Sequence, residues 1–127
     1  MLNIEEFRDF CLAKPGTTEE TPFGPATLVF NVMGKMYALS GIDNFEFINL
    51  KCDPEYAIEL REQYDGAIRP GYHMNKKQWN SVDTNGDVPA AMIYQLINHS
   101  YELVVNKLPK KLKLALNQLN ESDFTGQ

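Results

Sequence analysis

The chain has 127 residues, of which 43% are hydrophobic and 23% charged, and these values are ordinary for a globular protein with a single core. Its 12 basic and 17 acidic residues give a net charge of −5, which argues against a general nucleic-acid coat that binds by charge alone. A local basic face on an acidic body stays open, because the distribution of charge matters more than its sum.

The two cysteines and the lack of long apolar runs argue against a metalloprotein and against a membrane protein. Cys11 and Cys52 stand in no CxxC or Cys-His spacing, so the sequence predicts no metal site. With no signal peptide and no apolar run of membrane-spanning length, we expect a cytoplasmic protein with reduced thiols. No phosphate loop and no Gly-x-Gly-x-x-Gly stretch is present, so no cofactor is predicted, and a monomer is favoured.

The first half of the chain reads as one helix followed by three strands. Asn3 is a good cap for a helix that begins at Ile4 and stops at the Lys14-Pro15-Gly16 stretch. Residues 17–25, rich in proline and glycine, are expected to form a loop. Alternating side chains predict strands over residues 26–32, 35–40 and 45–50, with a tight turn near Gly34 between the first two.

The second half reads as a helix, two strands and two further helices. Asp53 and Pro54 predict a helix start, because aspartate caps well and proline is favoured at the first helical position. The later elements are predicted as a strand from about Ile68, a turn at Asn75-Lys76-Lys77, a strand over 78–82, a helix over 89–106 and a last helix after Pro109. We expect one domain over residues 1–120 and a polar tail over 121–127.

This order of elements predicts the fold class. Strands joined by short turns pair antiparallel, and such a sheet commonly carries its helices on one face. We therefore expect an α+β domain, a two-layer α/β sandwich whose antiparallel sheet has about five strands.

The residues that could carry catalysis fit structural roles better. Cys11 lies on the apolar stripe of the first helix, and Cys52, beside a helix N-terminus, has no assignable base. His73 and His99 have no nearby carboxylate pattern, although a functional role for His73 stays open. We therefore predict no catalytic residue and a protein that is not an enzyme.

The stretch RPGYHMNKKQWNSV is the strongest functional feature. It carries Arg69, Lys76 and Lys77 without an acid, together with Tyr72 and the only tryptophan, Trp79. Lysines at a hairpin tip can contact phosphates while aromatic rings stack on bases. The structural alternative makes Tyr72 and Trp79 cross-strand partners, with the lysines keeping an edge hairpin from pairing.

A second acid-free basic segment spans residues 103–119. Its lysines are Lys107, Lys110, Lys111 and Lys113. They are interpreted as the outer face of an amphipathic helix, and the two basic segments need not meet in space.

Five stretches cover nearly the whole chain in order: CLAKPGTTEETPFGP at 11–25, VMGKMYAL at 32–39, NLKCDPEYAIELRE at 49–62, PGYHMNKKQWNSV at 70–82 and SYELVVNKLPKK at 100–111. Together they resemble the MmcQ/YjbR family. The resemblance implies an α-β3-α-β2-α domain similar in architecture to secretion chaperones, and a DNA-binding protein with a double wing of hairpins. The motif positions that match are Pro22, Phe23, Gly24, Lys35, Pro70, Gly71, Tyr72, His73, Lys76 and Trp79.

Three functions stay open. The leading one is DNA binding by the residues Lys35, Arg69, Tyr72, His73, Lys76, Lys77 and Trp79. The second is a protein or peptide partner. The third is a small-ligand site or an unrecognised enzyme, which requires TPFGP and PGYHMNK to meet in a pocket containing His73. Gln78 stands where the family often has histidine, and this departure weakens an acid-base role more than a binding role.

Overall fold

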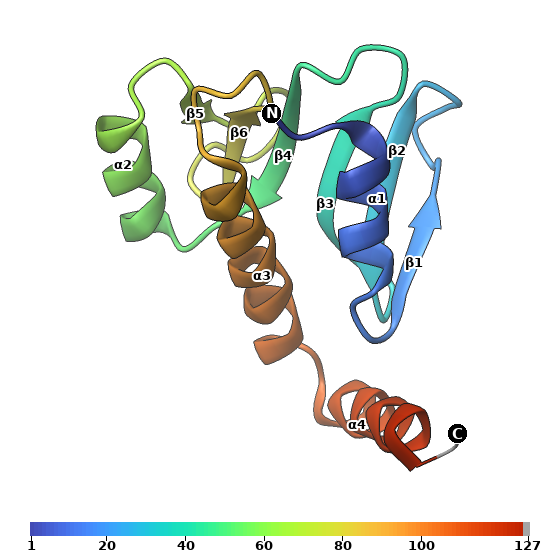
Figure 1. Cartoon of the computed structure of the whole chain (residues 1–127). Helices are drawn as coiled ribbons and strands as arrows, with labels where there is room; N and C mark the ends of the chain where they lie inside the picture. Colours follow the sequence, from blue (N-terminus) through green and yellow to red (C-terminus); the bar gives the residue numbers. More distant parts are fainter. Residues whose placement is uncertain (126–127) are drawn as a thin grey trace.

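The structure, a computed structural model, describes the backbone of residues 1–125 and the side chains of residues 1–119 (Figure 1). Its elements are α1 (Ile4–Leu12), β1 (Thr17–Glu20), β2 (Thr27–Val32), β3 (Lys35–Gly41), β4 (Phe47–Lys51), α2 (Pro54–Gln63), β5 (Ile68–Pro70), β6 (Trp79–Asp83), α3 (Ala90–Asn106) and α4 (Lys110–Thr125). None of these helices is both long enough and apolar enough to cross a membrane. The backbone of α4 runs into the predicted tail, whose side chains and last two residues lie outside the described part.

The sheet has six antiparallel strands in the order β1-β2-β3-β4-β6-β5. The predicted two-layer α+β class is confirmed, with one strand more than expected. The additional strand is β1, whose residues were predicted as part of a loop, and it pairs with β2 from Thr17↔Val32 to Glu20↔Val29. Its residues are all polar and show no apolar alternation, so only the long-range ladder to β2 defines it.

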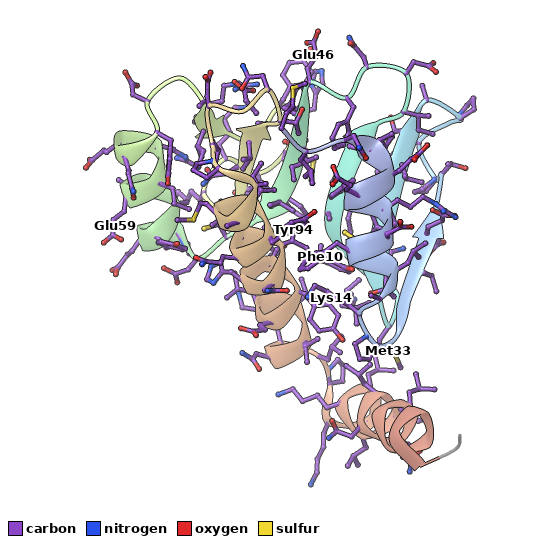
Figure 2. The ribbon with its side chains drawn as sticks, viewed as in Figure 1. Phe10, Lys14, Met33, Glu46, Glu59 and Tyr94 are labelled. Atoms are coloured by element: carbon purple, nitrogen blue, oxygen red, sulfur yellow. The ribbon has the colours of Figure 1, made fainter. Side chains whose placement is uncertain are left out.

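Helices α1, α2 and α3 cover one face of the sheet and bury the main core against it (Figure 1). Phe7 of α1 is fully buried and meets Phe30 of β2 edge-on, with ring centroids 5.3 Å apart. Phe10 of α1 and Tyr94 of α3 lie between the two helices (Figure 2), with ring centroids 4.4 Å apart. Because aromatic side chains bury large apolar areas, these contacts hold the helices on the sheet.

The opposite face of the sheet, here called the open face, carries a much smaller apolar cluster. Val29, Leu39 and Trp79 are buried there, and Met36 and Met74 pack against them. No helical residue of the described chain belongs to this cluster. An antiparallel sheet with one covered and one open face leaves surface for a ligand or partner.

The basic-aromatic hairpin is a short ladder closed by a long loop. The ladder between β5 and β6 stops before residues 71–78, so His73 lies in a loop where a strand was predicted. The Tyr72 N–H donates to Ser81 Oγ (3.0 Å), and the Tyr72 carbonyl accepts from Asn49 Nδ2 (3.3 Å). The backbone of Tyr72 is therefore bonded by side chains of β6 and β4 and not by the backbone of a partner strand. No periodicity in the sequence indicates these bonds.

Candidate functional site

Strands β3 and β4 pair over a short stretch and then diverge, which opens the sheet at one end. Their ladder includes only Ala38–Ser40 of β3. Beyond it, the Ser100 hydroxyl of α3 donates to the Tyr37 carbonyl at 2.5 Å and accepts from the Lys51 N–H at 2.9 Å. The start of β3 and the end of β4 are thus held on either side of a hydroxyl group, next to the C-terminal part of α3.

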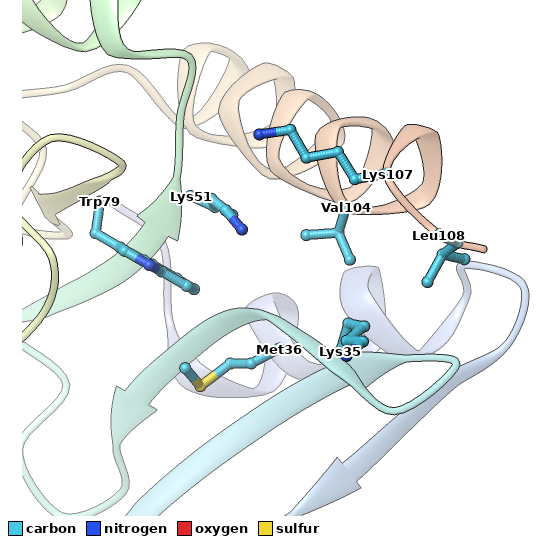
Figure 3. A pocket seen from close by; sticks show the side chains of 7 residues that line it. All are labelled: Lys35, Met36, Lys51, Trp79, Val104, Lys107 and Leu108. Atoms are coloured by element: carbon cyan, nitrogen blue, oxygen red, sulfur yellow. The ribbon is translucent and has the colours of Figure 1, made fainter.

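A pocket of about 280 Å³, here named the lysine pocket, lies between these segments (Figure 3). Its lining consists of three lysines, one tryptophan and three apolar side chains: Lys35, Met36, Lys51, Trp79, Val104, Lys107 and Leu108. Three elements supply the lysines, since Lys35 begins β3, Lys51 ends β4 and Lys107 directly follows α3. No carboxylate belongs to this lining.

The ammonium groups of Lys107 and Lys35 lie close enough to Lys51 to affect its protonation. Partial burial lowers the pKa of Lys51 from its ordinary 10.5, and the positive charges of Lys107 and Lys35 lower it further. The two ion pairs found among the described residues join other groups. Three like charges gathered without a counter-charge repel one another, so an anion between them would be favoured.

The basic residues predicted on the hairpin are mostly engaged within the protein. Arg69 Nη1 lies 2.7 Å from Asp83 Oδ1, which neutralises much of its charge. Lys76 Nζ donates to the Gly71 carbonyl at 3.1 Å and so braces its own loop. Lys77 is exposed on the same loop. Only Lys77 of these three therefore has an ammonium or guanidinium group without a protein partner in the described chain.

In the lysine pocket the structure brings together two of the predicted site residues, Lys35 and Trp79, and adds two that sequence reasoning missed. Lys51 lies in the matching stretch 49–62, but nothing there marked it as a site residue, because its place depends on where β3 and β4 separate. Lys107 belongs to the acid-free segment 103–119, which was interpreted as the face of a helix. The acid-free segment was therefore a usable signal for a site, because its Lys107 lines the same pocket as Trp79.

A second pocket, here named the aromatic pocket, lies on the open face further along β3. Its volume is about 430 Å³, and it is lined by Phe23, Thr27, Leu39, Ser40, Gly41, Phe47, Asn49, Tyr72, His73 and Met74. The TPFGP and PGYHMNK stretches therefore meet through Phe23 and His73, as the small-ligand hypothesis requires. The lining contains no Lys, Arg, Asp or Glu.

Tyr72 and Trp79 are not the cross-strand pair that the structural interpretation suggested. The Tyr72 ring lies 6.0 Å from Phe47 and 4.1 Å from His73, measured between centroids. Tyr72 is 59% exposed, whereas Trp79 is 6% exposed and packs in the apolar cluster of the open face. The two rings therefore serve different pockets.

The remaining motif residues shape the backbone around the aromatic pocket. Pro22 is exposed in the first loop, and Gly24 turns that loop with a φ of 107°, which favours glycine. Pro70 ends β5, and Gly71 follows it where a Cβ atom would lie 2.7 Å from Trp79 Cβ. These residues set the path of the chain, and they offer no charged group to a ligand.

The cysteines and His99 are buried or already bonded, whereas His73 is exposed on the loop 71–78. Burial raises the pKa of the Cys11 and Cys52 thiols to about 12, so neither is a thiolate near neutral pH. His99 Nε2 accepts from the Asp53 N–H at 3.2 Å, which is a structural role. Among the residues whose side chains are described, no three potential metal ligands gather.

Comparison with known proteins gives consistent matches along the chain. A family model described as YjbR matches residues 12–103. The uncharacterized protein YbdF of Escherichia coli O157:H7 is 45% identical over 91 residues, 71% of this chain and 74% of that protein. The uncharacterized protein YjbR of Escherichia coli K12 is 33% identical over 119 residues, 93% of this chain and 100% of that protein. The crystal structure of Deinococcus radiodurans protein DR2400, domain DUF419, has a TM-score of 0.86 at 39% identity, covering 92% of this chain and 89% of that one.

Proposed function

The chain belongs to the YjbR family, and we propose that it binds nucleic acid by holding backbone phosphates in the lysine pocket. Of the nucleic acids, DNA is the ligand that we propose first. The observation that carries this proposal is the gathering of Lys35, Lys51 and Lys107 around one pocket that no carboxylate lines. The binding site thus lies beside Trp79 at the diverging ends of β3 and β4, and not at the tip of the hairpin.

The chemistry of the lysine pocket suits a phosphodiester group. Each ammonium group has three donors and no acceptor, and phosphate oxygens accept several such bonds at once. Trp79 and Met36 place apolar surface next to the ammonium groups, where the carbon atoms of a sugar can pack. Contacts of this kind position a nucleic acid without reading its sequence.

The basic surface next to the lysine pocket supports a polymer over a small anion. Lys107 is followed within a few residues by Lys110 and Lys111, which are exposed at the start of α4. No acidic residue occurs over residues 103–119. Successive phosphates of one strand can contact both places, and this local basic face offsets the acidic charge of the whole chain.

A protein partner that extends the sheet has less support. The edge strand β5 has only three residues, Ile68–Pro70, and ends in proline, which cannot donate to a ladder. The other edge strand, β1, carries Glu19 and Glu20, and charges on an edge oppose pairing.

Binding of a fluorescently labelled DNA, followed by anisotropy at about 50 and about 200 mM salt, tests the proposal. Three phosphate contacts predict a slope of about −2 to −3 in the plot of log affinity against log salt. Replacing Lys51 with glutamine (Lys51→Gln) should weaken binding about three- to tenfold and reduce the slope by about 1.

The matched comparison is Lys77→Gln, which removes an exposed lysine outside the lysine pocket. It should change affinity less than about twofold if the pocket holds the phosphates. A larger loss with Lys77→Gln than with Lys51→Gln would move the site to the loop 71–78. An absence of binding at micromolar protein and low salt would contradict nucleic-acid binding altogether.

The lowered pKa of Lys51 predicts a pH dependence of the same binding. A lysine loses its charge as pH rises through its pKa, so affinity should begin to fall at a lower pH than an ordinary value of 10.5 implies. Lys51→Arg carries a guanidinium group that stays charged throughout the alkaline range, so its affinity should fall at a higher pH than that of the parent protein. Titrations of both proteins over this range, with folding checked by circular dichroism, measure the difference, and coincident profiles would contradict a role for Lys51.

A further inference from the structure

The aromatic pocket has no part in the proposed phosphate site, and two of its rings are left in water. Phe23 is 64% exposed and Tyr72 is 59% exposed. They come from loops far apart in the sequence and converge with Phe47 of β4 on one pocket. Exposed apolar side chains scattered singly need no explanation, but rings that converge on one hollow indicate a binding surface.

The lining restricts the charge and shape of what can enter. No Lys, Arg, Asp or Glu side chain lines the pocket, so an ion would lose hydration with little compensation from the lining. Aromatic walls favour a planar ring, which can stack on them. A volume of about 430 Å³ is sufficient for one ring system of one or two rings, and it lies in the range of small-molecule sites.

Asn49 supplies a polar group that can read the edge of such a ring. It is 5% exposed, its Nδ2 donates to the Tyr72 carbonyl at 3.3 Å, and its Oδ1 accepts from Ser81 Oγ at 2.5 Å. An amide has two N–H groups and two lone pairs, so one of each has no partner in the described chain. The complement is a ligand edge with a neighbouring acceptor and donor, which is the pattern that nucleobases carry.

The two pockets belong to one surface. Met36 and Trp79 line the lysine pocket, Leu39 and Met74 line the aromatic pocket, and all four pack in the apolar cluster of the open face. A chain of nucleotides can therefore cross this face with a phosphate in one pocket and a base in the other.

We propose that the aromatic pocket takes one unpaired base of a single-stranded nucleic acid, so that single strands and not duplexes are the ligand of the open face. This inference rests on the proposed function for the phosphate contacts. In a duplex the bases are paired and stacked, and their faces cannot reach the rings of Phe23, Phe47 or Tyr72. Stacking on aromatic side chains tolerates every base, so sequence preference should be weak.

The test compares a short single strand, a hairpin duplex of the same length and an abasic strand with the same backbone. The single strand should bind most tightly. Tyr72→Ala should weaken single-strand binding about five- to 150-fold, the loss of one stacked base, and change duplex binding less than about twofold. Phe23→Ala is the second variant, and Ile58→Ala, an exposed apolar residue of α2, is the control for truncation as such.

Methionine methyl signals locate the contacts independently of affinity. In protein labelled with ¹³C at the methionine methyl groups, Met36 reports on the lysine pocket and Met74 on the aromatic pocket. The single strand should shift both signals, the abasic strand only Met36, and free adenosine only Met74. These three patterns together support a base in the aromatic pocket.

The outcomes separate this inference from the proposed function. If single strands bind and Lys51→Gln weakens them while Tyr72→Ala and the Met74 signal show no change, the base pocket is wrong and phosphate binding stands. If no nucleic acid binds at low salt, the proposed function and the single-strand assignment both fail. A titration with adenosine alone then shows whether the aromatic pocket binds a free heterocycle. An unchanged Met74 signal in that titration would contradict heterocycle binding as well.

Discussion

Replacement of Phe7 by alanine is expected to lower the free energy of unfolding by about 3–5 kcal/mol. Phe7 is fully buried, meets Phe30 edge-on at 5.3 Å and lies 5.5 Å from the Phe45 ring. The loss combines the transfer of a large ring back to water with the cavity that remains, since close-packed neighbours relax only in part. Urea unfolding followed by circular dichroism measures it, as a lower midpoint at an unchanged slope.

Phe23→Ala is the matched control, because it is the same substitution at a ring that is 64% exposed. It should change stability by less than about 0.5 kcal/mol, as surface substitutions usually do. Equal losses for Phe7→Ala and Phe23→Ala would contradict the division between a helix-covered core and an open face.

Sequence patterns predicted the elements whose stabilising contacts are local. Asn3 accepts from the Glu6 N–H at 2.8 Å, and Glu6 Oε1 accepts from the Asn3 N–H at 3.1 Å, so the predicted Asn3 cap is present as part of a capping box. Asp53 caps α2 through the Tyr56 N–H as expected. Such contacts join residues three apart, which is why a short window of sequence contains them.

Elements defined by distant partners could not be predicted in the same way. β1 has polar residues only and exists through its ladder to β2. The loop 71–78 follows side chains of β4 and β6 where a regular hairpin was expected. In both cases the deciding hydrogen bonds join segments that are separated along the chain, and neither hydrophobic alternation nor turn chemistry encodes them.

The residues of the candidate site differ in the same way, because some lie in local motifs and others meet only in the folded chain. Trp79 and Lys35 lie in recognisable motifs, and both were predicted as site residues. Lys51 and Lys107 join them only because β3 and β4 separate next to the end of α3. Charge counting by segment found the residues that carry positive charge without an acid, but it could not show that Arg69 is neutralised by Asp83 across the ladder.

Ser100→Ala is expected to destabilise the protein by about 2–4 kcal/mol, because it leaves two backbone groups without a partner. Ser100 is fully buried, and its hydroxyl is the link between the Tyr37 carbonyl of β3 and the Lys51 N–H of β4. Removing one oxygen atom creates almost no cavity, so the loss measures the hydrogen bonds. Urea unfolding gives the value, and Thr21→Ala, which removes an exposed hydroxyl, is the control with an expected change below about 0.5 kcal/mol.

The same substitution tests how the fold builds the lysine pocket. Lys51 is positioned by its backbone bond to Ser100, so the variant should bind DNA more weakly than the parent protein even where both are fully folded. The loss should come with a smaller salt slope, as in Lys51→Gln, because the same phosphate contact is affected. A destabilised variant with unchanged affinity and salt slope would contradict this role of Ser100. The lysines would then reach a phosphate through the flexibility of their side chains, without help from the divergence of β3 and β4.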